Sequence, residues 1–457
     1  MISLLEVAER SQKGPKMAED AWNMGIFKKM NELAARYDIR VPDDCPFFNE
    51  DDEIVDKVYQ AAVDYLAERG VYCISNGRVI NFTRAEVLEA LKESPAEVII
   101  GEGRDRRTMR QRRIEEHEGL NHVPALHAPY SEELAPLAVR NYAEIATADY
   151  LEGFNFTHVD GREVLGMPLE AYAARRELAW LREGVRKAGR QGMAVAFYPI
   201  NTRAAVLLAP MDPDYGLRRT DGILLIVLPD IKVETDMLTA AIVYGDYGCF
   251  TIGAGTGRAG GFCGGLEGAM IESVVCGMAG WICYRNVING AGVRPVGPRI
   301  ATRLHVNPQA NWASSVVCQV FNTKYHTILY SGGYSLSGPG TETALVERAL
   351  FSVEIPINGC NVSYPRKAQA RINAAQTPVE AEFAWEIAQT VMRMKMTRSQ
   401  ANTLYRKMAE WAEGREAEQG MDVRECYDWV NHRPLPDYRE KYLRIKDDLF
   451  RMGLQFS

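Results

Sequence analysis

Hydrophobic residues recur at helical spacing over the first hundred positions of the chain. In "DEIVDKVYQAAVDYLAERG" (52–70) and "TRAEVLEALKESP" (83–95) they fall three and four residues apart, which is typical of amphipathic helices. Thr83 is followed three residues later by Glu86, the signature of a capping box. The pattern predicts a helical N-terminal extension over residues 1–120.

From about residue 122 the pattern changes to short apolar runs that alternate with helical runs. We expect strands at 123–128, 152–159, 193–199, 222–229, 249–255, 293–298, 326–333 and 352–359. Eight strand–helix units predict an α/β fold, a (β/α)8 TIM barrel over residues 121–395. An open doubly wound sheet is the alternative, because periodicity does not show closure. The charged, helical pattern of residues 396–457 predicts a C-terminal extension.

Composition narrows the class of protein. Hydrophobic residues make up 47% and charged residues 25% of the 457 positions, and the net charge is −7. This balance is typical of a globular protein and argues against general nucleic-acid or anionic-membrane binding. The run "GILLIVLP" (222–229) is too short to span a bilayer, and the early charges in "MISLLEVAERSQKGPK" argue against a signal peptide. We therefore expect a cytoplasmic location.

Cysteine and histidine spacings favour no metal site. The nine cysteines include no C-x-x-C pair, and most lie in apolar surroundings, so we expect reduced, buried thiols. No H-E-x-x-H or H-x-x-x-H motif is present. His122 and His127 are interpreted as loop or strand-end residues. The arginine-rich "GRDRRTMRQRR" (103–113) is interpreted as a solvated surface or subunit contact rather than an RNA site, since the chain is acidic.

A glycine-rich stretch, "GAGTGRAGGFCGGLEG" (253–268), contains a match to the dinucleotide-binding fingerprint G-x-G-x-x-G. That fingerprint should open the first strand–helix unit, with an acid about 20 residues on. Here it lies in the fifth unit, and "VCGMAGW" (275–281) contains no acid. In a barrel, residues 253–266 become the loop after the fifth strand, at the end where active sites lie. We therefore expect these glycines to shape a cavity rather than to bind a pyrophosphate.

Two sets of charged residues have both a structural and a functional interpretation. Glu267 is one of two acids in the apolar helix "GGLEGAMIESVVCGMAGWICY"; it either complements the helix dipole or holds a cation at the barrel mouth. Arg218 and Arg219 precede the fourth predicted strand. They form either a solvated loop or a guanidinium fork for a carboxylate or phosphate.

Several short motifs occur together in one order: "GVYC", "GEGRD", "GRQGMAV", "TDG", "AGGFCGGLE", "SGPGTE", "ECYD" and "MGLQF". With them the chain resembles, along its whole length, the monomethylamine:corrinoid methyltransferase family of methylotrophic methanogens. The resemblance implies a TIM barrel, a homohexamer and transfer of a methyl group to Co(I) of a separate corrinoid protein. The cobalamin would be carried by that partner, and none would be tightly bound to this chain.

The resemblance also assigns site residues. The family's pyrrolysine falls on Arg218, so this chain would be a member without pyrrolysine and would use a betaine or N-methyl amino acid, whose carboxylate Arg218 and Arg219 would orient. Glu267 and Tyr334 correspond to catalytic positions, and Gly332 stands where the family has glutamine. Phe262, Tyr244 and Tyr247 could add aromatic faces for an ammonium group. The glycines expected to admit the corrinoid are Gly260, Gly261, Gly264 and Gly265.

Two other classes of function remain open at this point. One is a barrel lyase or oxidoreductase with its own cofactor. The other is a non-catalytic paralogue that binds a corrinoid protein or a methylated ligand.

Overall fold

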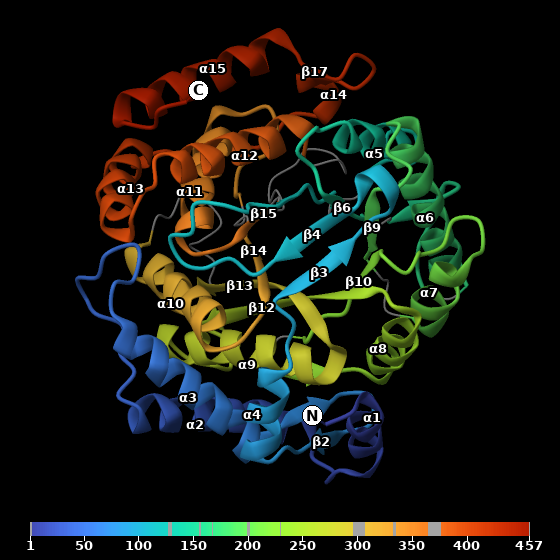
Figure 1. Cartoon of the computed structure of the whole chain (residues 1–457), viewed down its shortest axis with the longest axis vertical. Coiled ribbons are helices and arrows are strands. Elements are labelled where there is room, and N and C mark those ends of the chain that lie inside the picture. The colour runs from blue at the N-terminus through green and yellow to red at the C-terminus, as the bar shows by residue number, and fades with distance from the viewer. Residues whose placement is uncertain are drawn as a thin grey trace.

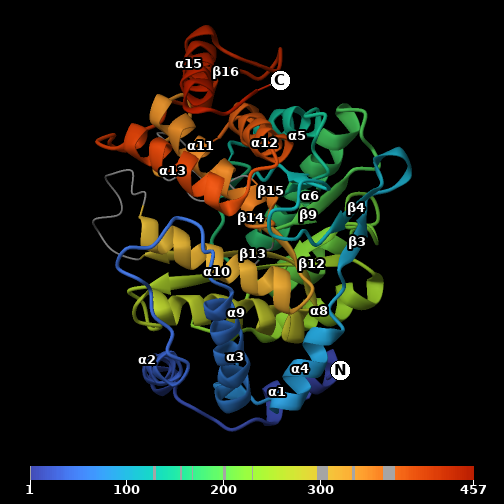
Figure 2. The ribbon, with the colours of Figure 1, turned by 60° about the vertical axis from the view of Figure 1, so that its left-hand side comes forward.

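Central strands inside a ring of helices dominate the computed structural model of the chain (Figure 1). The structure describes residues 2–126, 130–154, 157–166, 168–198, 202–228, 230–295, 307–331, 335–363 and 376–456. The N-terminal helices lie at one end of the molecule and the C-terminal helix at the other, with the strands between them (Figures 1 and 2).

Eight parallel strands form the barrel. Consecutive strands along the chain are neighbours in the sheet, and β15 pairs with β5. A parallel bridge between Ala125 and Glu152 joins β5 to β6 and closes the ring. The predicted barrel is therefore confirmed. Its strands are β5 (His122–Val123), β6 (Tyr150–Glu152), β9 (Ala194–Phe197), β10 (Gly222–Leu224), β12 (Phe250–Ala259), β13 (Asn286–Pro295), β14 (Ile328–Ser331) and β15 (Asn361–Ser363).

Helices surround the strands on all sides (Figure 1). They are α5 (Ala135–Ala143), α6 (Leu169–Lys187), α7 (Arg203–Leu207), α8 (Thr235–Tyr247), α9 (Leu266–Tyr284), α10 (Pro308–Lys324), α11 (Glu342–Ile357) and α12 (Pro378–Arg393). Among the described helices, α9 alone has the length and apolarity to cross a membrane, but 89% of its apolar window is buried inside the protein. Packing in the core explains its composition.

The prediction of the eighth strand was wrong. Residues 352–357 belong to α11, which ends at Ile357, and the strand follows at β15. The β-branched run in "SVEIPING" favours a strand locally. However, Leu345, Ala349, Val353 and Ile357 are buried at helical spacing, and Pro356 falls in the last turn, where the helix is about to end. The sixth strand was also misplaced, because β13 begins at Asn286 rather than at residue 293.

The N-terminal extension contains strands as well as the predicted helices α1 (Leu4–Lys13), α2 (Glu19–Arg36), α3 (Asp52–Arg69) and α4 (Arg84–Lys92). The capping box of Thr83 and Glu86 is present at the start of α4. β1 (Val71–Cys73) and β2 (Arg78–Ile80) form a small sheet with β11 (Lys232–Val233). The two remaining strands, β3 (Glu97–Ile100) and β4 (Arg107–Arg110), form an antiparallel hairpin that includes part of the arginine-rich run.

This hairpin closes the amino end of the barrel. Ile100 and Met109 belong to the same buried cluster as the inward residues of the barrel strands. Figure 1 shows β3 and β4 lying across the near side of the strands. The part of the extension that sequence reasoning assigned to a surface therefore also completes the core.

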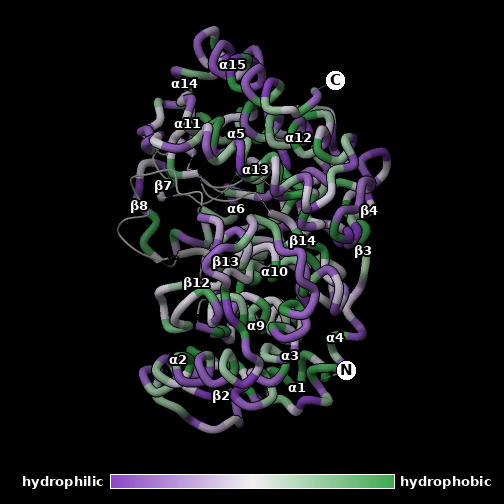
Figure 3. The backbone as a smooth tube through the Cα atoms, turned by 90° about the vertical axis from the view of Figure 1, so that its left-hand side faces the viewer, coloured by the Kyte–Doolittle hydropathy of each residue, from purple (hydrophilic) through white to green (hydrophobic). Residues whose placement is uncertain are grey.

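The C-terminal extension comprises α13 (Arg398–Ala412), α14 (Val423–Cys426), the hairpin of β16 (Tyr427–Asp428) and β17 (Arg433–Pro434), and α15 (Pro436–Met452). Helix α15 mixes hydrophilic and hydrophobic residues (Figure 3). It buries Tyr438, Ile445 and Leu449, which lie at helical spacing along one face. A short hairpin after β6 is made of β7 (His158–Val159) and β8 (Arg162–Glu163).

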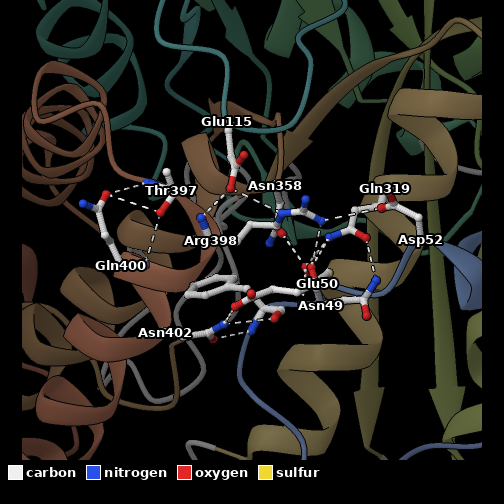
Figure 4. A network of polar contacts seen from close by, with 12 residues as sticks. Asn49, Glu50, Asp52, Glu115, Gln319, Asn358, Thr397, Arg398, Gln400 and Asn402 are labelled. Carbon is white, nitrogen blue, oxygen red and sulfur yellow. Dashed lines mark hydrogen bonds and ion pairs between the residues drawn. The ribbon is translucent and has the colours of Figure 1, made fainter.

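A polar network fastens the N-terminal segment to the barrel helices (Figure 4). The Asn49 side chain donates to Gln319 Oε1 on α10 at 2.7 Å, and Gln319 Nε2 donates back to the Asn49 carbonyl oxygen at 2.8 Å. Asn402 of α13 accepts from the Phe48 amide at 2.8 Å, and the Arg398 guanidinium donates to the Asn49 carbonyl oxygen. The segment between α2 and α3 is thereby held against both the barrel and the C-terminal extension.

Candidate active site at the carboxyl end of the barrel

The inside of the barrel is packed with apolar side chains at its centre. In a TIM barrel this packed core is not a pore, and chemistry takes place above it, at the carboxyl ends of the strands. The inward residues of the described strands are Val123, Tyr150, Ala194, Ala196, Leu224, Phe250, Ile252, Ile288 and Ile328.

Tyr150 and Glu152 stand together at the carboxyl end of β6. Tyr150 belongs to the interior cluster whereas Leu151 belongs to the outer one, so the alternation of a strand turns Glu152 inward as well. The Tyr150 hydroxyl donates a hydrogen bond to Glu152 Oε1 at 3.0 Å. Glu152 is 2% exposed. A carboxylate thus lies at the top of an otherwise apolar interior.

Small residues flank Glu152 on the neighbouring strands. Its partners in the sheet are Ala125 on the β5 side and Ala196 on β9. Two further tyrosines, Tyr198 and Tyr330, are half-buried and pack against the interior cluster. Among the described residues, the site therefore combines one acid with three tyrosines and little aliphatic bulk beside the carboxylate.

A second buried acid, Glu177 of α6, approaches the ends of β6 and β9 from outside the barrel. A Cβ atom on Gly153 would lie 2.2 Å from Glu177 Oε1, so a larger residue there would displace this carboxyl group. Burial raises the pKa of Glu177 well above its usual value, and the backbone amides of Phe154 and Tyr198 partly offset this. Burial therefore favours the neutral carboxyl of Glu177 beside the ends of these two strands.

The expectation that Arg218 and Arg219 orient substrate is not supported by their position. Both precede β10, so they lie at the amino end of the barrel, opposite the end where active sites form. Arg218 donates to the Gln191 carbonyl oxygen at 2.7 Å and lies 3.5 Å from a Glu102 carboxylate oxygen. The guanidinium of Arg219 lies over the Tyr247 ring. Residues that immediately precede a barrel strand lie at its amino end, so their side chains cannot reach the carboxyl end of the barrel.

The first half of the predicted loop 253–266 is strand. β12 runs to Ala259 and pairs with β13 as far as Pro295. Gly255 and Gly257 face α9, where a Cβ atom on Gly257 would lie 1.8 Å from the Ala269 carbonyl oxygen. These glycines therefore allow close helix–strand packing, and the fingerprint match has a structural cause.

The remaining loop, residues 260–265, turns back at the tip of this two-stranded ribbon. Gly260 and Gly264 have φ of +95° and +83°, a region that favours glycine, and Gly260 donates to the Gly264 carbonyl oxygen at 2.7 Å. A Cβ atom on Gly264 would contact Phe27 of α2. The loop thus packs on the N-terminal extension. Gly261, Phe262 and Gly265 are exposed at this tip.

Glu267 lies in the first turn of α9 beside the same tip and is half-buried. Its Oε1 accepts a hydrogen bond from the Val41 amide at 3.2 Å. The tip is about 20 Å beyond Ile252 along β12, since a strand rises about 3.3 Å per residue. Glu267 therefore ties α9 to the N-terminal segment.

Tyr334 and Gly332 lie outside the described residues, as does His127. Leu336 and Ser337 follow Tyr334 closely in the sequence. Their amides donate to Glu347 of α11 at 2.8 and 2.9 Å, which fixes this part of the segment after β14. Tyr244 is buried and donates to the Leu207 carbonyl oxygen.

Two other predictions concern metals and thiols. All nine cysteines are free and buried, as predicted. Within the described ranges, no group of three or more histidine, cysteine, aspartate or glutamate residues could hold a metal ion. His122 begins β5, where burial lowers its pKa to about 3, so it is neutral at physiological pH.

Sequence reasoning missed Tyr150, Glu152 and Glu177. The predicted second strand, 152–159, placed Glu152 at the amino end, because "FNFTHV" looked more strand-like than "ADYLEG". The alternation of Tyr150, Leu151 and Glu152 was the available signal, but three residues are too few for periodicity to decide. Glu177 sits in an ordinary amphipathic helix pattern, where an acid is usually solvated.

Comparisons with known proteins agree along the whole chain. The family model described as monomethylamine methyltransferase MtmB matches residues 2–454. Monomethylamine methyltransferase MtmB2 of Methanosarcina acetivorans is 25% identical over 461 residues, which cover 98% of this chain and 97% of the relative. MtmB1 of Methanosarcina barkeri is 24% identical with the same coverage. The crystal structure of the Methanosarcina barkeri enzyme superposes with a TM-score of 0.89 at 22% identity, over 99% of this chain and 98% of that one.

Proposed function

The chain belongs to the monomethylamine methyltransferase MtmB family, and on that premise we propose that it transfers a methyl group from an N-methylated ammonium compound to the Co(I) of a corrinoid carried by a separate protein. The family match over residues 2–454 carries this proposal. The barrel, with its carboxylate and tyrosines at the carboxyl end, supports it.

The corrinoid would supply the cobalt nucleophile that accepts the methyl group. The carbon–nitrogen bond breaks, its electron pair stays on nitrogen, and the neutral amine leaves. The chain itself contributes positioning, which in favourable cases lowers a barrier by roughly 7–11 kcal/mol. Residues at the carboxyl ends of β6, β9 and β14 hold the substrate so that its methyl group faces the partner.

The class of methyl donor is argued from a residue that the sequence lacks. All 457 positions are standard amino acids, so the sequence contains no pyrrolysine. Pyrrolysine has an electrophilic imine carbon to which an amine can bind. Without it, a protonated primary amine has no covalent anchor, whereas a quaternary ammonium releases a neutral tertiary amine. We therefore favour a betaine or an N-methyl amino acid over monomethylamine. Because Arg218 and Arg219 lie at the amino end, they no longer argue for a carboxylate on the donor.

Further parts of the proposal rest on family likeness and composition. We propose a cytoplasmic enzyme that assembles as a homohexamer and binds no cofactor tightly, with a corrinoid protein as its partner and no role for nucleic acid or membrane. Tyr334 remains a candidate catalytic residue and Gly332 a substrate contact. The loop glycines Gly260, Gly261, Gly264 and Gly265 remain candidates for admitting the corrinoid, and Phe262 remains a candidate aromatic face for the ammonium group.

A direct assay tests the methyl transfer. The purified chain is mixed with a reduced corrinoid protein and a panel of methylamines, betaines and N-methyl amino acids, and the absorbance change of corrinoid methylation is followed. We expect turnover with at least one quaternary donor and none with monomethylamine. Turnover with monomethylamine alone would refute the proposed donor class. A nucleotide or metal bound after purification would favour a lyase or oxidoreductase, and binding without turnover would favour a non-catalytic paralogue.

A further inference from the structure

We propose that helix α15 binds the α15 of a second copy of this chain, antiparallel and about a two-fold axis, through the face that it turns away from the protein. This inference goes beyond the proposed reaction, because it names an interaction surface and the partner that fits it. It would give the proposed homohexamer one two-fold contact, and it does not depend on methyl transfer.

Helix α15 lies at the outer end of the molecule (Figures 1 and 2). It packs against α11 and α13, and its Lys446 forms an ion pair with Glu386 of α12. Its inward residues Tyr438, Ile445 and Leu449 are buried by this packing. In the part of the chain that the structure describes, these contacts cover one side of the helix, and the other side meets solvent.

Two large apolar side chains lie on the uncovered side. Leu443 is 52% exposed and Phe450 is 57% exposed. They are seven residues apart, so they lie on one line along the helix, about 10 Å from each other. Single exposed apolar residues are normal on a protein surface, whereas two in line at a seven-residue spacing are typical of a helix that packs against another helix. The line predicts a helical partner outside this chain.

Four charged residues flank this line on one side and alternate in sign along the helix. All four are exposed; they are Glu440, Arg444, Asp447 and Arg451. Their order is antisymmetric about the midpoint between Ile445 and Lys446. Glu440 and Arg451 lie equally far from that point on opposite sides, and so do Arg444 and Asp447. The sequence of charges is therefore complementary to itself when it is read in the reverse direction.

An antiparallel two-fold pair uses this complementarity. It places each residue opposite its mirror position in the second copy, and it brings the same flank of both helices together. Each Glu440 then faces an Arg451, and the inner acid faces the inner arginine, so every charge meets an unlike charge. Leu443 lies about 3 Å along the axis from Phe450 of the second copy, close enough for the two to pack. A parallel pair would instead set each charge beside its own copy.

Contacts within the chain leave these charges available. Arg444 donates one nitrogen to Glu342 at 2.7 Å, and Arg451 pairs with Asp447 on the same helix. The side chains of Arg451 and Asp447 are 71% and 55% exposed, and exposed pairs contribute little to stability. An arginine has five N–H donors, so one pair leaves donors for another. Among the described residues, Glu440 has no ion-pair partner.

The mass of the assembly tests the contact without donor or corrinoid. Sedimentation velocity of the purified chain is measured over a range of protein concentrations, and we expect the wild type to form an even-numbered assembly. Leu443→Asp should halve its mass or raise the concentration needed for assembly by about tenfold or more. Leu208→Asp is the matched control, because Leu208 is 68% exposed just after α7, and it should leave the assembly unchanged.

Two charge reversals test the antiparallel pairing itself. Glu440→Arg would face Arg451 of the second copy, and Arg451→Glu would face Glu440, so each variant alone should associate about tenfold more weakly or worse. In a mixture of the two variants every facing pair is again unlike, and association should return to the wild-type level. Mixing would not repair a role that either residue plays inside its own chain.

Each outcome decides the question. A wild type that stays monomeric at every concentration would overturn the contact, as would an assembly that Leu443→Asp leaves unchanged. A mixture of the reversed variants that associates no better than either alone would also overturn it, and the charges would then be a solvated face. Assembly through α15 without methyl transfer would sustain the contact and reject the proposed function. Methyl transfer by a monomer would sustain the function and reject the contact.

Discussion

Gly257 and Ala269 bring strand β12 and helix α9 together backbone to backbone. A Cβ atom on Gly257 would lie 1.8 Å from the Ala269 carbonyl oxygen and 2.6 Å from its carbonyl carbon. Both atoms belong to the main chain, so neither can move without shifting the helix. This contact explains a glycine that the sequence alone presented as part of a nucleotide-binding fingerprint.

Gly257→Ala is therefore expected to destabilise the protein. Overpacking of this kind typically costs about 1–3 kcal/mol, measurable as a lower urea midpoint. Gly245→Ala is the control, because the nearest atom to a Cβ there is Leu4 Cδ1 at 4.0 Å and alanine favours the helix. The control should be neutral or slightly stabilising. If both variants unfold at the wild-type midpoint, the close packing of β12 on α9 is refuted.

Glu354 gives the stability of the protein a dependence on pH. Burial raises its pKa to about 7, although it accepts hydrogen bonds from Tyr405 and Asn311. The neutral carboxyl is favoured in the folded state, so its contribution to the free energy of unfolding is complete below the ordinary glutamate pKa of 4.5. That contribution is lost as the pH rises towards 7 and amounts to at most about 3 kcal/mol.

Glu354→Gln should remove this dependence. The measurement is the free energy of unfolding in urea at several pH values between 4.5 and 7.5, for the wild type and the variant. The difference between the two should change across that window in favour of the variant as the pH rises. A difference that stays constant with pH would contradict the raised pKa.

Arg218→Ala should leave methyl transfer unchanged. The side chain is at the amino end of the barrel, and 40% of its surface is exposed. Its ion pair with Glu102 is partly solvated, and such pairs contribute little to stability, about 0–1 kcal/mol. The check is kcat/KM for the best donor of the panel. A loss of tenfold or more, with stability unchanged, would restore the carboxylate-binding role that the sequence suggested.

Glu267→Gln distinguishes the two interpretations of that acid. Because the carboxylate accepts from the Val41 amide and sits in the first turn of α9, we expect a loss of stability of about 0.5–1.5 kcal/mol with ammonium binding unchanged. Urea unfolding and betaine titration measure the two effects. A large loss of kcat/KM at unchanged stability would instead assign Glu267 to the reaction.

The order of strands and helices could be predicted because each barrel strand is followed by its own helix. Helices α3, α4 and α9 were placed within a few residues of their observed bounds, since their apolar residues recur often enough to show the helical pattern. Strand ends were harder to predict. β6 and β15 have only three residues each, and a run such as "SVEIPING" is compatible with either state.

The candidate site was harder still to predict from sequence. Glu267 and the glycine loop were chosen for their unusual composition, which turned out to reflect packing against α9 and the N-terminal extension. Glu152 lay unnoticed at the end of a three-residue strand, between two alanines contributed by other strands. What makes it distinctive is its surroundings, which come from residues far away in the chain.

The sequence by itself determined the (β/α)8 class, the family likeness and the buried thiols, because periodicity and composition are local properties that each segment carries. Only the tertiary structure decided which end of the barrel Arg218 faces, why Gly257 must be glycine, and that Tyr150 and Glu152 meet inside the closed ring. Those facts depend on the direction of each strand and on the register between neighbours. Both are set by contacts between segments tens to hundreds of residues apart, which no local pattern records.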